Sequence, residues 1–592
     1  MANVPEGSSA LRHDALRRWL ALAVGAILAL YGVYWGYRFL VSRLGALAPL
    51  VFAISALPVL AGIAAWSWHC YATIITHHAT RVARWAWCNV EQADWYQTSR
   101  TRHPARYRFA SDRVDPHGAT GLGLSIVVVA AAAALWAFAE VLIEVVSGAS
   151  ITTVDHRVIN LFQMLRTPAA DRVMLGATYI GSGRGVAVIA GAAVLVAILL
   201  RRWRDAVMVV ASLVAGTAFF SIIKLIIRRP RPPLYDARIV QSGFSFPSGH
   251  ATMAAVFYAT LAVILIHAVR SFWLRLLIVL CATVAVVWIG LSRVYLGVHY
   301  PSDVLAGWAG GVLWALLALV ALRSWRARHT STDDDAPLGE RGIAVGWLRR
   351  ATAVLVPIAA IAYLGAVWPS VPAPPVAHRP APFTITDAQL LPVLRTRVSR
   401  YTVGLFGHRQ EPINLIFIGS MAEVVHAFTA AGWVKADRLS GASLRKALLA
   451  VLTGRPDPTG PVTPSFLGEE TESLAFSQPV GRTFAQRHHI RIWRTSYMLT
   501  SGMPVWLATA SYDEGYAITA GSLLPVHQIA PDIDTERKYV VASVMHTSLV
   551  ADTTGIQLVP PEMGTNAFGQ PFFTYGRALV IRLRDLPATS TP

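Results

Sequence analysis

The chain has 592 residues, enough for more than one domain, and its composition is far from that of a soluble protein. Charged residues make up 14% of the chain, against about 25% in typical soluble domains, and hydrophobic residues reach 54%. These values exclude a wholly soluble protein, whose surface would be too apolar to stay dispersed, and they predict a membrane protein.

The net charge of +19 comes from 52 basic and 33 acidic side chains. The basic residues gather between long apolar runs, a pattern that favours cytoplasmic loops and anionic lipid. We therefore expect the bilayer as a partner and no nucleic acid, and the sequence does not indicate a protein partner. The three cysteines lack paired spacing and predict neither a disulfide framework nor a metal site.

Nine apolar runs approach the length of about 20 residues that a membrane-spanning helix needs. They lie near residues 19–40, 47–68, 121–146, 184–200, 206–227, 251–268, 274–291, 303–322 and 351–368. The first run is too long for a signal-peptide core and is predicted to be a retained span. Since several short helices can instead be re-entrant, nine spans is a working figure.

Arginine groups fall in alternate connections between these runs, which predicts their orientation. The arginine-bearing connections are 69–120, 201–204, 270–275 and 323–328, and all face the cytoplasm if the N-terminus does. The connections 41–46, 147–183, 228–250 and 292–302 then face the other side, as does the chain beyond the ninth span.

A Pro-rich stretch, Pro369 to Pro382, follows the ninth run and is typical of a semi-rigid spacer. Beyond it the periodicity changes, and strands are predicted at Ile413–Ile418, His489–Trp493, Val505–Ala510 and Ala578–Leu583. Helices are predicted at Met421–Ala431, Ser443–Leu452 and Thr535–Met545. The sequence therefore predicts a soluble, extracytoplasmic α+β domain.

Three clusters carry polar residues that a membrane protein uses sparingly. The first runs from Lys224 to Pro233, where Lys224 and Arg231 are two helical turns apart and share a face. The second, FPSGHAT, begins at Phe246 and predicts a helix start whose free N–H groups suit a phosphate. The third, SRVYLGVHYPSD, begins at Ser292 and ends at Asp303.

These clusters resemble, at every position, the three-part signature of the type 2 phosphatidic acid phosphatases, which are related to vanadium haloperoxidases. The matching residues are Lys224, Arg231, Pro232, Pro247, Ser248, Gly249, His250, Ser292, Arg293, His299 and Asp303. Each basic residue alone has an ordinary alternative role, such as Lys224 reaching the interface or Arg228 or Arg229 contacting headgroups. Three spaced motifs in order are far harder to obtain by chance.

The resemblance implies that His299 attacks phosphorus, that Asp303 orients it and that His250 protonates the leaving group. It also implies a phosphate cradle made of Lys224, Arg231, Ser248, Gly249 and Arg293. It implies no metal and no other cofactor. Pro412–Gly419, Ser443–Phe466 and His488–Thr495 resemble the LssY C-terminal domain, which is found fused to such phosphatases.

The predicted fold is a mainly α, polytopic membrane protein with a six-helix phosphatase core, extra spans and a C-terminal α+β domain. The expected boundaries are 1–118 for two spans and a basic segment, 119–328 for the core, 329–382 for a loop, a span and the tether, and 383–592 for the last domain. We expect hydrolysis of lipid phosphate monoesters or pyrophosphates at a bacterial inner membrane, with the active site on the periplasmic side. The alternatives are a non-catalytic lipid-binding or transport component, and vanadate-dependent haloperoxidase chemistry.

Two weaker patterns complete the interpretation. Gly307 and Gly311 have the spacing of small-residue helix contacts, which predicts packing within the bundle. His488 and His489 are adjacent on a predicted strand, so they point to opposite faces and do not predict a metal site.

Overall fold

The computed structural model describes residues 101–102, 104, 122–148, 150–233, 235, 237–328, 341–368, 380–440, 442–443, 446, 457–480, 486–519, 522–566 and 569–586. The chain divides into two compact units, Pro58–Arg379 and Pro380–Pro592, the latter together with Met1–Leu57. The predicted spans at 19–40 and 47–68 and most of the predicted helix Ser443–Leu452 lie outside the described residues.

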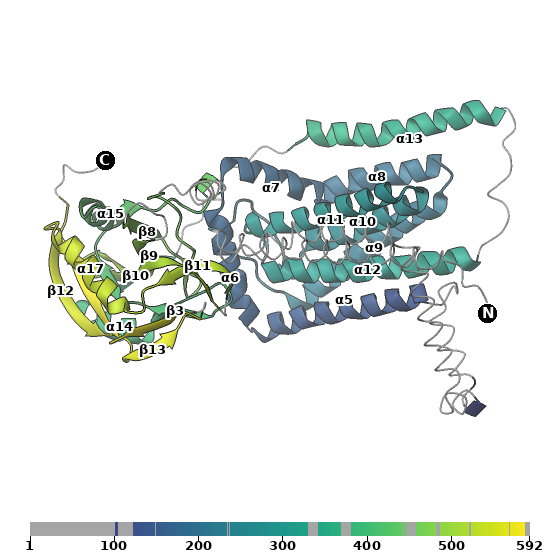
Figure 1. Cartoon of the computed structure of the whole chain (residues 1–592). Coiled ribbons are helices and arrows are strands. Elements are labelled where there is room, and N and C mark those ends of the chain that lie inside the picture. The colour runs from purple at the N-terminus through teal and green to yellow at the C-terminus, as the bar shows by residue number, and fades with distance from the viewer. Residues whose placement is uncertain are drawn as a thin grey trace, which may run out of the picture. The chain divides into compact units, whose positions relative to one another are not determined.

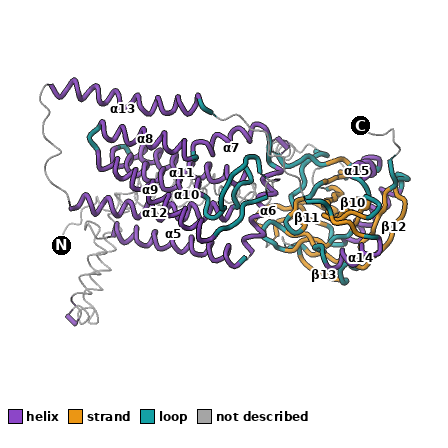
Figure 2. Tube along the Cα trace, turned by 180° about the vertical axis from the view of Figure 1, so that it is seen from behind, coloured by secondary structure: helices purple, strands orange, loops and turns teal. Residues whose placement is uncertain are grey.

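The unit Pro58–Arg379 is helical in its described part, and its long helices lie side by side (Figures 1 and 2). Its helices are α5 (Leu122–Ser147), α6 (Ser150–Met164), α7 (Pro168–Ile180), α8 (Gly183–Leu199), α9 (Trp203–Ile227), α10 (Gly249–Ala268), α11 (Phe272–Tyr295), α12 (Pro301–Arg328) and α13 (Arg341–Ala366). Each predicted span from residue 121 onward corresponds to one of these helices.

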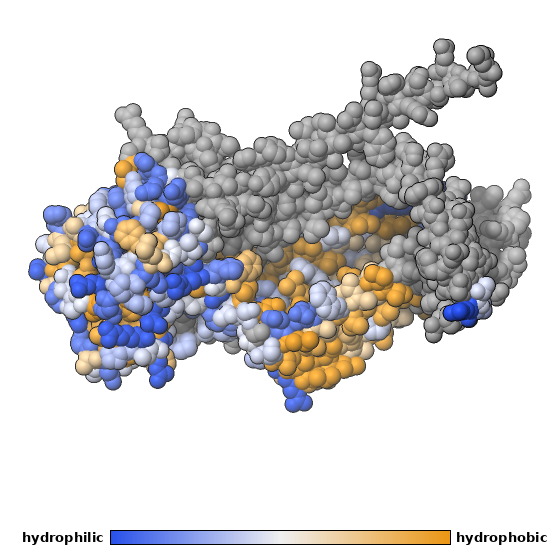
Figure 3. Space-filling model, turned by 60° about the horizontal axis from the view of Figure 1, so that its bottom comes forward, coloured by the Kyte–Doolittle hydropathy of each residue, from blue (hydrophilic) through white to orange (hydrophobic). Residues whose placement is uncertain are grey.

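Within the described residues, α5, α9, α10, α11 and α12 are long and apolar enough to cross a membrane. The pair α7 and α8 is bent by 53° and passes the same test only as one broken span, and the apolar part of α13, Ala351–Ala366, is shorter. Large apolar side chains such as Trp136, Val214 and Ile226 are exposed on these helices, and Figure 3 shows a broad apolar area on this unit. The exposed apolar surface and the helix lengths make this a multi-pass membrane protein.

The segment 147–183, predicted only as a connection, contains α6 and α7. Helix α6 mixes polar and apolar residues, and it buries Asp155 and Arg157 beside Ile159 and Phe162. A hydrophobicity window does not detect such a helix, because its buried face is partly charged.

Glycines let α12 approach α10 closely. A Cβ atom on Gly307 would lie 2.9 Å from Ala251 Cβ, and one on Gly311 would lie 2.3 Å from Ala255 Cβ. The prediction that Gly307 and Gly311 pack within the bundle is therefore confirmed. The end of α9, the start of α10, the end of α11 and the start of α12 all lie at one end of the bundle. The three motifs fall in these segments, so they meet there.

The C-terminal unit is an α+β domain, as predicted. Its helices are α14 (Asp387–Thr396), α15 (Met421–Ala430) and α17 (Ile533–Met545). Its strands are β1 (Phe383–Ile385), β2 (Tyr401–Val403), β3 (Arg409–Pro412), β4 (Leu415–Ile418), β5 (Val434–Lys435), β6 (Phe466–Leu467), β7 (Glu470–Thr471), β8 (Leu474–Pro479), β9 (Arg487–Leu499), β10 (Pro504–Thr519), β11 (Ser522–Ile529), β12 (Val550–Gln557), β13 (Glu562–Thr565), β14 (Pro571–Thr574) and β15 (Arg577–Leu583).

A mixed sheet of nine strands organises this domain, with the central order β12-β15-β4-β10-β9-β8-β5. One face packs a core that includes Phe428 of α15 and Val540 of α17, and the other face packs Leu390 of α14. The adjacent residues His488 and His489 lie on opposite faces, as predicted: His488 is 2.8 Å from Glu536 and His489 is 3.2 Å from Asp513.

Candidate active site

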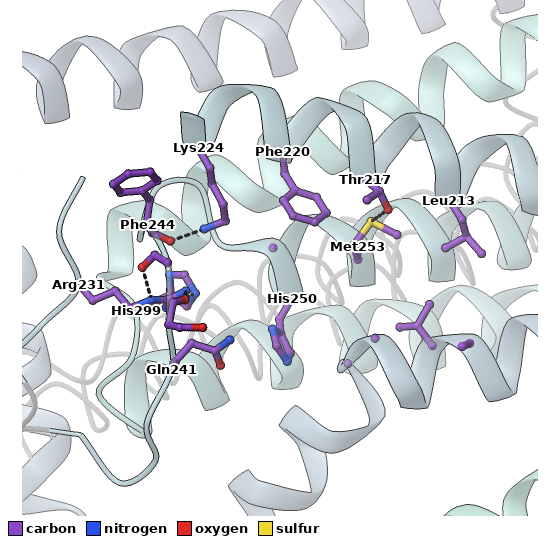
Figure 4. A pocket seen from close by; sticks show the side chains of 17 residues that line it. Leu213, Thr217, Phe220, Lys224, Arg231, Gln241, Phe244, His250, Met253 and His299 are labelled. Atoms are coloured by element: carbon purple, nitrogen blue, oxygen red, sulfur yellow. Dashed lines mark hydrogen bonds between the residues drawn. The ribbon is translucent and has the colours of Figure 1, made fainter. Parts of the chain in front are cut away.

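A cavity of about 500 Å³ lies where α9 ends and α10 begins (Figure 4). Its polar end contains five of the predicted site residues: Lys224, Arg231, Gly249, His250 and His299. The other three, Ser248, Arg293 and Asp303, are buried behind this lining. The structure therefore brings all eight predicted residues into one region, from three motifs that span eighty positions of the chain.

His299 lies in the turn between α11 and α12 and is only 2% exposed. Its Nδ1 is 3.2 Å from Asp303 Oδ2, and its Nε2 is 3.0 Å from Arg231 Nη1. A guanidinium can only donate, so Nε2 accepts from Arg231 and the ring proton resides on Nδ1, where the carboxylate accepts it. This hydrogen-bond network assigns the tautomer that keeps a lone pair on Nε2, at the cavity.

Burial lowers the pKa of His299 well below its ordinary value, and the charges of Arg293, Arg231 and Lys224 act in the same direction. The imidazole is therefore neutral around pH 7, as a nitrogen nucleophile must be.

The two basic residues of the first motif hold the loop that closes the cavity. Lys224 Nζ donates to the carbonyl oxygens of Phe244 and Ser245, at 2.6 and 3.1 Å. Arg231 donates to the carbonyls of Ser242, Gly243 and Val298. Both side chains thus order the loop 242–245 and keep two positive charges at the cavity, where they favour an anion.

Arg293 is 1% exposed and is held by two side chains. It donates from Nη1 to Thr178 Oγ1 and from Nη2 to Gln241 Oε1, the latter at 2.7 Å, and Gln241 lines the cavity. Its Nε is buried and has no hydrogen-bond partner among the residues that the structure describes. A buried donor without a partner is costly, so this N–H is a candidate ligand for a bound anion.

The second motif forms the first turn of α10. Ser248 is the N-cap, and its side chain accepts from the amide of Ala251. A Cβ atom on Gly249 would lie 3.2 Å from the ring of Phe220, so a glycine at this position lets α9 and α10 approach each other. His250 follows on the cavity wall, within the first turn, whose backbone amides have no partner inside the helix.

Four residues that the sequence analysis did not select support Asp303. Ser245 Oγ donates to Asp303 Oδ2, and Arg229 Nη1 donates to Asp303 Oδ1 at 2.8 Å. Arg229 Nη2 in turn donates to Asp155 Oδ2 at 2.8 Å, and Asp155 also accepts from the amide of Ser302. The alternative that Arg229 contacts headgroups therefore does not describe its position, because both of its terminal nitrogens bind buried carboxylates.

This arrangement is suited to nucleophilic displacement at an anionic centre. It offers a neutral imidazole with its lone pair at the cavity, a carboxylate behind it, a second histidine on the wall and three cationic side chains nearby. The three cations suit phosphoryl transfer in particular, since its transition state spreads negative charge over the equatorial oxygens.

Two parts of the chain match known protein families. Residues 205–327 match the PAP2 superfamily, and residues 395–577 match the LssY C-terminus. The chain is 30% identical over 183 residues to phosphatidylglycerophosphatase B of Bacillus subtilis, covering 30% of this chain and 88% of that protein. It is 38% identical over 134 residues to decaprenylphosphoryl-5-phosphoribose phosphatase of Mycobacterium tuberculosis, covering 22% of this chain and 69% of that protein.

A shorter match, 35% identical over 97 residues, is to lipid A 1-phosphatase of Rhizobium johnstonii and covers 16% of this chain and 36% of that protein. Among solved structures, a transmembrane PAP2 type phosphatidylglycerolphosphate phosphatase from Bacillus subtilis is 27% identical, with a TM-score of 0.30, covering 33% of this chain and 98% of that one. On the identity and coverage of these sequence relatives, the chain belongs to the PAP2 superfamily.

Proposed function

We propose that this chain hydrolyses lipid phosphate monoesters or pyrophosphates through a phosphohistidine formed on His299. The observation that carries the proposal is the geometry of this imidazole, whose Nδ1 meets Asp303 at 3.2 Å while Nε2 meets Arg231 at 3.0 Å. When a phosphate enters, the Arg231 N–H can move to a phosphate oxygen and leave the Nε2 lone pair free to attack.

In the first step the Nε2–P bond forms as the bond from phosphorus to the leaving oxygen breaks. His250 gives its proton to that oxygen, and Lys224, Arg231 and Arg293 neutralise the developing charge. In the second step water attacks phosphorus, its proton passes to His250 and the Nε2–P bond breaks. Because basic side chains balance the charge in this scheme, no metal ion takes part in it.

The apolar part of the cavity supports a lipid as the substrate. Lys224, Phe220, Thr217 and Leu213 follow one another along one face of α9 (Figure 4), and all four line the cavity. This face extends about 16 Å from the cationic end at 1.5 Å per residue. Val186 of α8 and Met253 of α10 line the same region, so a chain attached to a bound phosphate would lie against apolar side chains.

The names of the relatives support the substrate class, because each of the three names a phosphatase of a phosphorylated lipid. The arginine pattern supports a site that opens toward the non-cytoplasmic side of a bacterial inner membrane. The alternative, a non-catalytic protein that binds or transports phosphorylated lipid, would use the same cations without needing the pair His299 and Asp303.

The test is phosphate release by the purified chain across a panel of lipid phosphates and pyrophosphates, in the presence of EDTA. We expect release by the wild type and by His267→Ala, an exposed histidine near the far end of α10, and none by His299→Ala. A short incubation with phosphate-labelled substrate should trap an acid-labile phosphoenzyme in the wild type and in His267→Ala but not in His299→Ala.

Activity in His299→Ala would refute the histidine intermediate, and loss of activity on adding EDTA would refute the metal-free scheme. Binding of the lipids without any phosphate release by the wild type would favour the transport alternative. Bromination of a dye with vanadate and peroxide would favour haloperoxidase chemistry.

A further inference from the structure

The hairpin of β13 and β14 presents an apolar face that nothing in the described structure covers. Met563 and Phe573 are directly opposed in this antiparallel pair, as are Thr565 and Pro571, so these four side chains share the outer face. Met563 is 87% exposed, and Tyr575, the residue after β14, is 69% exposed.

The inner face of the same hairpin is packed against the domain. Phe572 is 2% exposed, and its ring would lie 3.1 Å from a Cβ atom placed on Gly564. Thr574 donates to Asp534, and the amide of Tyr575 donates to the same carboxylate. The outer apolar face is therefore held rigidly in place, and its exposure does not come from a loosely attached hairpin.

Exposed arginines lie near the end of this face. Arg395 donates to the carbonyl of Gln557, and the Gln557 side chain donates to the carbonyl of Tyr575. Arg577 is exposed immediately after Tyr575 and Gly576. Arg395 and Arg577 are both exposed, so this rim presents two positive charges beside the apolar face.

We propose that this apolar hairpin and its arginine rim dock the C-terminal domain on an anionic lipid surface. Methionine and aromatic side chains with flanking arginines have the chemistry of interfacial membrane contacts, in which rings enter the headgroup region and cations meet lipid phosphates. A second copy of the chain is a poorer occupant, because a symmetric contact would oppose two arginine rims.

The connection to the membrane favours the same occupant. Only residues 367–382 separate the end of α13 from the start of β1, so the domain stays within reach of the bilayer that holds the helices. Attachment of this kind raises the effective concentration of lipid at the domain, and a modest contact area is then enough for docking.

The test uses the full chain, one copy per lipid nanodisc, with Cys70, Cys88 and Cys281 replaced by serine. A polarity-sensitive dye is attached at Met563→Cys, at Tyr575→Cys or at the control Thr554→Cys, an exposed position on β12. In discs containing phosphatidylglycerol we expect the dyes at 563 and 575 to be quenched several-fold more by nitroxide lipids than the dye at 554, and to be protected from iodide. Added salt or pure phosphatidylcholine should reduce the difference.

Resistance of the C-terminal domain to limited proteolysis, compared with the unlabelled chain, checks that this domain is folded in each labelled protein. Two hairpin positions prevent one poorly tolerated variant from deciding the result. Equal quenching at 563, 575 and 554 would overturn the proposal. So would protection at 563 that appears only when two copies share a disc, because the face would then bind a second copy.

Discussion

Asp303 is anchored by partners from distant parts of the chain, and this gives Asp155 a positioning role. Asp155 binds one terminal nitrogen of Arg229 while the other binds Asp303, and it also binds the amide of Ser302 beside Asp303. Without the charge of Asp155, the guanidinium loses one of its two carboxylates and Asp303 loses a fixed partner. Hydrogen bonds to charged groups contribute about 1.5–3 kcal/mol, so Asp155→Asn should lower kcat about 10- to 100-fold.

This substitution should leave KM nearly unchanged, because Asp155 does not line the cavity and is proposed to act through Asp303. Glu140→Gln, which changes an exposed carboxylate on α5, is the matched control and should behave as the wild type. Steady-state phosphate release gives both constants. A rise in KM at constant kcat would contradict the positioning role and indicate a part in substrate binding.

At this scale the sequence predicted the residues that belong to contiguous motifs, and the structure gathers them around one cavity. The sequence did not predict the part that Asp155 and Arg229 play at the site. Their ion pair joins positions 74 residues apart, and the bond from Ser302 to Asp155 joins positions 147 apart. Single residues at such separations carry no spacing pattern, although a carboxylate in a weakly polar segment is itself a signal of a buried partner.

At the scale of the helices, the contact between α10 and α12 fixes the site. Asp303 is in the first turn of α12, and its carbonyl accepts from the amide of Ser248 at 2.9 Å, at the start of α10. A Cβ atom on Gly311 would lie 2.3 Å from Ala255 Cβ and 3.0 Å from the carbonyl of Thr252, so the helices must separate. Overpacking of this kind costs about 1–3 kcal/mol.

Gly311→Val should therefore lower the midpoint of thermal unfolding and reduce kcat/KM at least about 10-fold. The next residue provides the control, since Val312 is exposed and Val312→Ile adds one methylene outside the contact. Melting curves in detergent and phosphate release measure the two effects. Wild-type behaviour of Gly311→Val would show that the helices tolerate separation and that the site does not depend on their contact.

The long apolar helices were predicted because an uninterrupted apolar run is a strong signal, but α12 continues beyond the predicted 322 to Arg328 and α13 begins before the predicted 351, at Arg341. Helices α6 and α7 were not predicted, because their polar and apolar residues mix. Similarly, β10 continues to Thr519, beyond the predicted Val505–Ala510, through the polar residues of Ser511 to Glu514. Their pairing with β9 and β11, and not their hydrophobicity, keeps them in the sheet.

For the whole molecule, the position of the proposed site within one unit predicts that catalysis does not need the C-terminal domain. All of its residues lie between Asp155 and Asp303, inside the unit Pro58–Arg379, and the C-terminal domain supplies none of them. A protease site inserted in the tether, residues 369–379, would separate the two units after folding. Cleavage should leave the rate of hydrolysis of a short-chain, detergent-soluble lipid phosphate within about twofold of the rate of the uncleaved chain. This corresponds to a change of about 0.4 kcal/mol in the activation barrier. Phosphate release before and after cleavage measures it, with a protease-treated chain lacking the inserted site as control. A loss of activity specific to the cleaved chain would mean that the C-terminal domain contributes to catalysis, either by a residue or by holding the helices in their active arrangement.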